Sequence, residues 1–206
     1  MLGALRFLSR LERATEAMRA ALNVLAEVAP EWVREQVDLE WFERYSRRIE
    51  DYRLPKDKEA RIEYLKTVGT DDIRLLAKLD DPEAAPRSLK QLPEEVEILH
   101  RIWEQQYVEI EGGVRVLDPK EMLEAARRVE SPYETEAHYS TKGAMSWVGY
   151  KVHLTESCDD EDLPNLITSV RTTVATATDV NQLGVRRTDR GSLVNKPTVL
   201  QWIRKR

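Results

Sequence analysis

Two stretches in which apolar and polar residues alternate constrain the fold of this chain most strongly. In the first, residues 147–154, one face carries Val148, Tyr150, Val152 and Leu154. Lys151 and His153 lie on the opposite, polar face of the same stretch. The second, residues 166–174, is rich in β-branched side chains, which favour extended backbone. Because an acidic stretch separates the two, the sequence predicts an antiparallel β-hairpin whose apolar face is half-buried.

The part of the chain that precedes this hairpin predicts helices. Apolar residues recur at three- and four-residue steps along residues 2–28, and a proline ends that pattern. A second helix is expected over residues 30–49, with its aromatic side chains in a core. Two shorter helices are expected at 57–67 and 71–79, separated by Gly69 as a helix C-cap.

The segment that follows changes character twice. Residues 80–93 contain three prolines and little apolar periodicity, which predicts a surface linker. A helix is expected to begin at Glu94, and residues 107–117 alternate around Gly112-Gly113 as in a tight hairpin. Asp118-Pro119 is expected to start another short helix.

These patterns predict an α+β chain in three parts. Residues 1–130 form a mostly helical region, residues 131–183 contain the β-hairpin, and residues 184–206 form a tail. The tail holds seven basic residues and one acidic residue, a local charge of +6 on a chain whose net charge is −5. Phosphate contacts depend on local positive charge, so an acidic protein with a basic tail can still bind DNA.

Composition excludes several classes of protein. The chain is 41% hydrophobic and 33% charged, which is typical of a folded protein and not of a disordered one. No apolar run approaches the ~18–20 residues of a membrane span, so we expect a cytoplasmic protein without a membrane partner. Its single cysteine, Cys158, excludes an internal disulfide and argues against a structural zinc site. No nucleotide-binding or common hydrolase motif occurs.

Several motifs together resemble the central part of a bacterial insertion-sequence transposase of the DDE type. Near the hairpin these are SPYETEAHYSTK at 131–142, WVGYKVHLTE at 147–156 and LITSVRTTVATATD at 166–179. Upstream, the segments 7–12, 19–35 and 40–56 belong to the same pattern, so the resemblance covers roughly residues 4 to 180. The tail after Gln182 departs from it.

The resemblance implies an RNase-H-like fold in which three carboxylates hold two Mg²⁺ ions for DNA cutting and joining. It also implies that the first catalytic aspartate precedes this chain and that the second follows it. We therefore expect a truncated transposase with a partial RNase-H-like domain at 131–183. Such a chain is not catalytically competent alone, and we assign it no catalytic residue, no metal ligand and no cofactor of its own.

The acidic residues near the hairpin have simpler interpretations. A solvated turn accounts for five of them: Glu156, Asp159, Asp160, Glu161 and Asp162. Asp179 follows an ATAT run and is expected to be the N-cap of a helix.

Basic residues are the candidates for DNA contact. We assign this role to Lys142, Lys151, His153, Arg186, Arg187, Arg204, Lys205 and Arg206. A further basic cluster consists of Arg44, Arg47, Arg48 and Arg53, interleaved with Tyr45 and Tyr52. It could face nucleic acid, but the acidic residues among them favour exposed ion pairs.

Two alternatives to the truncated enzyme remain open. The chain could be a non-catalytic regulatory module that binds DNA or an intact transposase. Alternatively, the apolar stripe of residues 2–28 could pair with a second copy. The partners expected from the resemblance are therefore DNA at transposon ends, intact transposase, or the chain itself.

Overall fold

The computed structural model describes residues 8–89, 91–156 and 166–178, and it divides into two compact units. The helical unit comprises residues 6–135, and the sheet unit comprises residues 136–206 together with residues 1–5. The described part is therefore of mixed α+β class, as the sequence predicts. An RNase-H-like fold stays a prediction.

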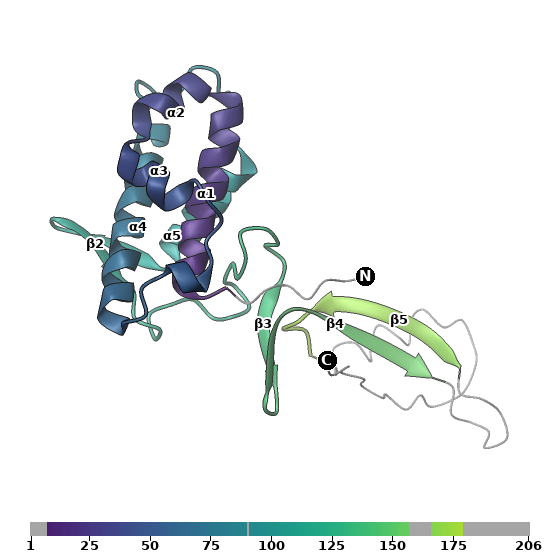
Figure 1. Cartoon of the computed structure of the whole chain (residues 1–206). Helices are drawn as coiled ribbons and strands as arrows, with labels where there is room; N and C mark the ends of the chain where they lie inside the picture. The colour runs from purple at the N-terminus through teal and green to yellow at the C-terminus, as the bar shows by residue number, and fades with distance from the viewer. Residues whose placement is uncertain (1–7, 90, 157–165, 179–206) are drawn as a thin grey trace. The chain divides into compact units, whose positions relative to one another are not determined.

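The first helix of the helical unit, α1 (Arg10–Val28), begins at a capping box. The Ser9 hydroxyl accepts a hydrogen bond from the Glu12 amide, and the Glu12 carboxylate accepts one from the Ser9 amide. Small and large apolar residues alternate along its buried side, where Ala14, Ala17 and Met18 are fully buried. α1 packs against α4 and α5 (Figure 1), so its apolar stripe is covered within this unit.

The prediction of a single helix over residues 30–49 is wrong. The structure has two short helices, α2 (Pro30–Gln36) and α3 (Leu39–Tyr45), followed by a 3-10 turn, η1 (Asp51–Arg53). The break occurs because Asp38 adopts extended backbone and accepts a hydrogen bond from the Trp41 amide at 2.9 Å. A carboxylate at an N-cap satisfies the amides that a new helix leaves open.

The two helices expected at 57–67 and 71–79 are one continuous helix, α4 (Lys58–Asp80). Gly69 lies inside it, where a Cβ atom would come within 2.5 Å of the Tyr107 ring. The Gly69 carbonyl also accepts a hydrogen bond from the Trp103 indole at 2.8 Å. This glycine therefore allows two aromatic side chains to approach the helix, and it does not end it.

The rest of the helical unit follows the sequence expectation more closely. Residues 81–93 run through turns to α5 (Glu94–Glu104), and a hairpin joins β1 (Tyr107–Ile110) to β2 (Gly113–Val116). Gly112, at φ 87°, supplies the left-handed backbone that this turn requires. The helix expected after Asp118-Pro119 is absent, because residues 118–127 form turns. No helix in the described part of the chain has the length and apolar character to cross a membrane.

The sheet unit contains three antiparallel strands in the order β3-β4-β5. They are β3 (His138–Lys142), β4 (Met145–Glu156) and β5 (Ile167–Val174). The pairing of β4 with β5 confirms the predicted hairpin. β3 was not anticipated, although Gly143, at φ 58°, marks the tight turn that joins it to β4.

The expected burial of this hairpin is inverted. Val152 is 48% exposed, whereas His153 on the face expected to be polar and open is 3% exposed. Two polar groups on that face have hydrogen-bond partners: His153 Nε2 lies 2.9 Å from Thr173 Oγ1, and Lys151 Nζ donates to the Ala177 carbonyl at 2.8 Å. Burial of polar side chains is tolerated where such partners exist.

Candidate nucleic-acid interface

An exposed basic segment of the helical unit follows α3 and includes η1. We call residues 46–53 the basic loop. Arg47, Arg48, Tyr52 and Arg53 are exposed, and Tyr52 reaches 72% exposure. Ile49, between them, is buried in the core. The loop therefore has one apolar anchor and presents its basic and aromatic side chains outward.

A buried carboxylate fixes the helix that leads into the basic loop. Asp71 on α4 accepts hydrogen bonds from the Trp41 indole at 2.9 Å and the Tyr45 hydroxyl at 2.7 Å, and it pairs with Arg44. Burial raises the pKa of Asp71, while the bond from Tyr45 and the charge of Arg44 oppose that rise. Arg44 and Tyr45 therefore hold α3 on α4. This structural contact distinguishes them from the exposed residues of the cluster.

A second buried carboxylate fixes the loop itself. Glu16 on α1 accepts hydrogen bonds from the Ile49 amide and the Tyr133 hydroxyl. The Arg19 guanidinium contributes two more, at 2.9 and 3.1 Å. Burial alone would raise the pKa of Glu16, but these bonds outweigh it, so the pKa lies below its ordinary value. The basic loop is thus displayed on a firm support, as binding loops commonly are.

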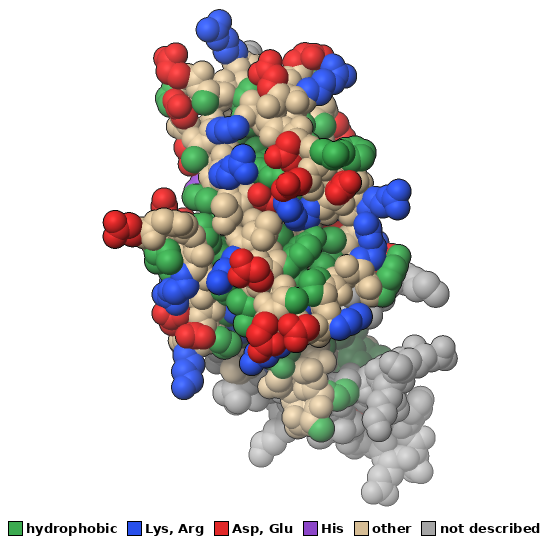
Figure 2. Space-filling view, turned by 60° about the vertical axis from the view of Figure 1, so that its left-hand side comes forward, with side chains coloured by type: hydrophobic (Ala, Val, Ile, Leu, Met, Phe, Trp, Pro, Cys, Tyr) green, Lys and Arg blue, Asp and Glu red, His purple; other side chains and the backbone are tan. Residues whose placement is uncertain are grey.

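The exposed arginines of the basic loop have no ion-pair partner among the described residues. Arg44 pairs with Asp71 and, at 4.0 Å, with Glu40, but no such pair involves Arg47, Arg48 or Arg53. Among the side chains that the structure describes, the ion pairs of this cluster are therefore those of Arg44. The side chain of Asp51 lies outside the described ones, so exposed pairs with it stay a prediction. Figure 2 shows acidic, basic and apolar side chains interspersed over one face, so the surface of the helical unit is of mixed charge there.

The DNA-contact residues assigned in the sheet unit differ in accessibility. Lys142 is exposed at the end of β3, and Lys151 is half-buried with its ammonium group bonded to a carbonyl. His153 is buried. The other candidates, Arg186, Arg187, Arg204, Lys205 and Arg206, lie outside the described residues. DNA contact by all eight stays a prediction.

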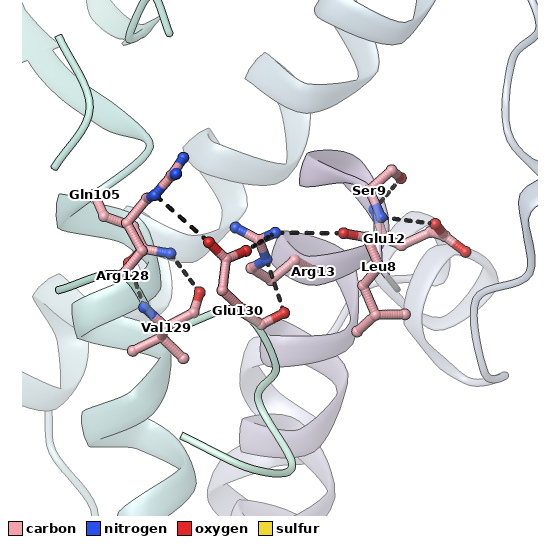
Figure 3. Close-up of polar contacts among 8 residues, drawn as sticks. All are labelled: Leu8, Ser9, Glu12, Arg13, Gln105, Arg128, Val129 and Glu130. Carbon is pink, nitrogen blue, oxygen red and sulfur yellow. Dashed lines mark hydrogen bonds and ion pairs between the residues drawn. The ribbon is translucent and has the colours of Figure 1, made fainter. Parts of the chain in front are cut away.

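A third polar network fastens the end of the helical unit (Figure 3). Arg13 on α1 pairs with Glu130 at 2.5 Å, and the two side chains are 5% and 4% exposed. The Arg13 guanidinium also donates to the carbonyls of Glu130 and Leu8. Gln105 forms two hydrogen bonds with the backbone of Val129, at 2.8 and 2.9 Å. Burial lowers the pKa of Arg13, and the Glu130 charge counters this.

No sequence pattern marks these supporting residues, since Asp71, Glu16 and Glu130 resemble ordinary surface acids in a chain that is 33% charged. Each is identified only by a partner 26 to 117 positions away. Local periodicity and short motifs do not reveal a hydrogen-bonding partner at that separation in the sequence.

The acidic groups do not converge on a metal-holding arrangement within the described ranges. No three His, Cys, Asp or Glu side chains come together there. The described residues therefore do not fit the paired Mg²⁺ ions that the transposase resemblance implies, because such ions require several converging carboxylates. Asp159, Asp160, Glu161, Asp162, Asp179 and Cys158 lie outside the described residues.

Comparisons with family models, with curated proteins and with solved structures find no match to this chain. The resemblance to DDE transposases thus rests on the quoted motifs alone.

Proposed function

We propose that this chain is a non-catalytic nucleic-acid-binding module that contacts DNA through the basic loop. The observation that supports this proposal is the combination, on one loop, of an exposed tyrosine with three exposed arginines that form no ion pair with the described residues. One buried carboxylate, Glu16, holds this loop, and a second, Asp71, holds the helix that leads into it. A link to transposition is part of the proposal and comes from the sequence resemblance.

The chemistry of the basic loop suits a phosphate backbone. Arginine guanidinium groups bind phosphate oxygens in a forked geometry, and their positive charge releases counterions from the nucleic acid. Tyr52 offers a flat ring on which an unstacked base can lie, and this favours single-stranded DNA. These contacts are not specific to sequence, because they involve phosphates and ring faces and not the edges of bases.

A triple substitution tests the proposal. In Arg47→Ala/Arg48→Ala/Arg53→Ala, we expect weaker binding to single-stranded DNA and a shallower salt dependence. Each lost phosphate contact reduces the slope of log K against log[salt] by roughly 0.7, so three contacts reduce it by about 2. Fluorescence anisotropy with labelled oligonucleotides at several salt concentrations measures both quantities.

A matched triple variant, Arg34→Ala/Lys66→Ala/Arg115→Ala, serves as the control. It removes the same charge from positions of the helical unit whose side chains pair with acids. Tyr52→Ala separates stacking from charge, since we expect it to weaken binding by about 1–3 kcal/mol without changing the slope. Equal losses in the two triple variants would show that total charge, and not the basic loop, binds DNA.

The non-catalytic part of the proposal has its own test. The purified chain is incubated with terminal-repeat DNA and Mn²⁺, and the products are separated on a denaturing gel. We expect intact DNA, and site-specific nicking would contradict this part while leaving the binding result unaffected.

A further inference from the structure

Two adjacent aspartates on α4 have opposite surroundings. Asp71 accepts hydrogen bonds from three side chains, as described above. Asp72 is fully buried, and neither of its carboxyl oxygens has a hydrogen-bond partner among the described residues. A buried carboxylate without a partner is strongly destabilising, so the chemical state of Asp72 requires an explanation.

The charged and titratable groups around Asp72 do not supply a counterion. Asp71 on α4, Tyr45 on α3 and Tyr107 on β1 interact with it electrostatically, and all three are acids. The positive charge of Arg10 on α1 interacts with Tyr107. Neither Arg10 nor any other basic residue in the described part of the chain offsets the charge of an ionised Asp72. The Tyr107 hydroxyl is also buried without a partner.

Protonation would resolve this arrangement chemically. An ionised carboxylate can only accept hydrogen bonds, whereas a carboxylic acid also has an O–H group that can donate one. Helix carbonyls in this unit already accept such bonds from side chains one turn later, as Thr15, Thr67 and Thr70 show. A neutral Asp72 would also avoid the repulsion from Asp71.

We propose that Asp72 holds a proton in the folded helical unit, so that the stability of this unit is linked to pH and falls as the solution becomes alkaline. The inference is independent of nucleic-acid binding, because Asp72 is buried and the basic loop is exposed.

The direction of the effect follows from linkage. Burial, followed by the charge of Asp71, raises the pKa of Asp72 well above its ordinary value of 3.8. The stability that the proton contributes is therefore fully present below pH 3.8, and it is lost as pH rises from there through the folded-state pKa. Within that window the unfolding equilibrium constant rises by up to about tenfold per pH unit, which is the limit for one proton.

The test is the pH dependence of unfolding of the full chain and of Asp72→Asn, which imitates the neutral acid. Urea unfolding is followed by circular dichroism at 222 nm, because the described helices all lie in the helical unit. We expect the ratio of wild-type to variant unfolding constants to grow with pH, by up to about tenfold per unit. Asp57→Asn makes the same chemical change at the exposed N-cap of the same helix and is the control for the substitution itself. Parallel profiles for the wild type and Asp72→Asn would overturn the proposal.

A second measurement does not depend on the variant folding. Carbon NMR of the wild-type chain, with backbone-based assignment, reports the ionisation of the Asp72 carboxyl directly. We expect its chemical shift to remain that of the protonated acid at pH values well above 3.8. An Asp72 carboxyl that titrates at or below that value would overturn the proposal.

Discussion

The helical unit and the sheet unit bury different kinds of side chain. In the helical unit, apolar residues from α1, α3, α4, α5 and β1 form one buried cluster, with Leu25, Leu75 and Leu99 fully covered. In the sheet unit, Val170 is 63% exposed while His153 and Thr155 are buried. The comparison shows that apolar periodicity identifies an element but does not by itself decide which of its faces is covered.

The physical difference lies in how many neighbours each element has. A helix in the helical unit packs against several others, so its apolar stripe is covered from more than one side. A single layer of three strands has two faces, and its cross-strand hydrogen bonds can stabilise polar residues on the covered one. Buried polar groups also occur in the helical unit, but there they join distant segments.

The largest loss of stability is expected when a buried polar contact between distant segments of the helical unit is removed. Glu130→Ala leaves Arg13 buried without its counterion, and we expect a loss of about 3–5 kcal/mol in the free energy of unfolding. Urea unfolding monitored by circular dichroism at 222 nm measures it. Glu31→Ala removes an acid of an ion pair whose side chains are 73% and 80% exposed, and we expect about 0–1 kcal/mol.

Equal losses in these two variants would contradict the structural role of the Arg13–Glu130 pair. They would also weaken the comparison between the units, because the end of the helical unit would then depend on its apolar core alone.

An intermediate effect is expected from neighbouring positions on β4. His153→Thr removes a buried, hydrogen-bonded ring, and we expect a loss of about 1–3 kcal/mol. Val152→Thr keeps the β-branched shape at an exposed position, and we expect a change within about 0.5 kcal/mol. Both substitutions end in threonine, so strand propensity is held constant. The NMR resonance of the Trp147 indole N–H, followed during urea unfolding, reports on this unit.

A larger loss of stability for Val152→Thr than for His153→Thr would contradict the observed burial. It would instead support the burial that the alternating pattern predicts. The difference between the two units would then disappear, because both would bury their apolar faces.

The elements that sequence predicted correctly are those whose signal is local. α5 and the two hairpins, β1-β2 and β4-β5, each lie within a short stretch whose periodicity and turn residues are sufficient. The errors depend on distant partners. Gly69 could end a helix or allow a close approach, and only Tyr107, 38 positions later, decides between them.

The same reasoning applies to the candidate site. The sequence presents Arg44, Arg47, Arg48 and Arg53 as one basic cluster with two tyrosines. Only the position of Asp71 separates Arg44, which holds α3 on α4, from the three arginines that remain exposed. The burial of His153 was likewise not predictable, because the alternation of residues along β4 does not determine which face of the sheet is covered.

The smallest effect is expected at the hairpin β1-β2, the part of the helical unit whose strands are as open to solvent as those of the sheet unit. Arg115 holds Glu121 with two hydrogen bonds, at 2.8 and 3.1 Å, and the Asp118 amide adds a third at 2.7 Å. These bonds lower the pKa of Glu121 to about 2. Their contribution to stability is present above the ordinary value of 4.5 and is lost as pH falls through about 2.

Arg115→Ala removes the largest cause of this shift, so we expect the pKa of Glu121 to rise toward 4.5 in a carbon NMR titration. Thermal unfolding at neutral pH should change little, because an exposed ion pair is screened by water and salt. An unchanged titration would show that the Asp118 amide alone holds the carboxylate. A large loss of stability would instead show that exposed pairs support the helical unit as strongly as buried ones, which the comparison of Glu130→Ala with Glu31→Ala would also detect.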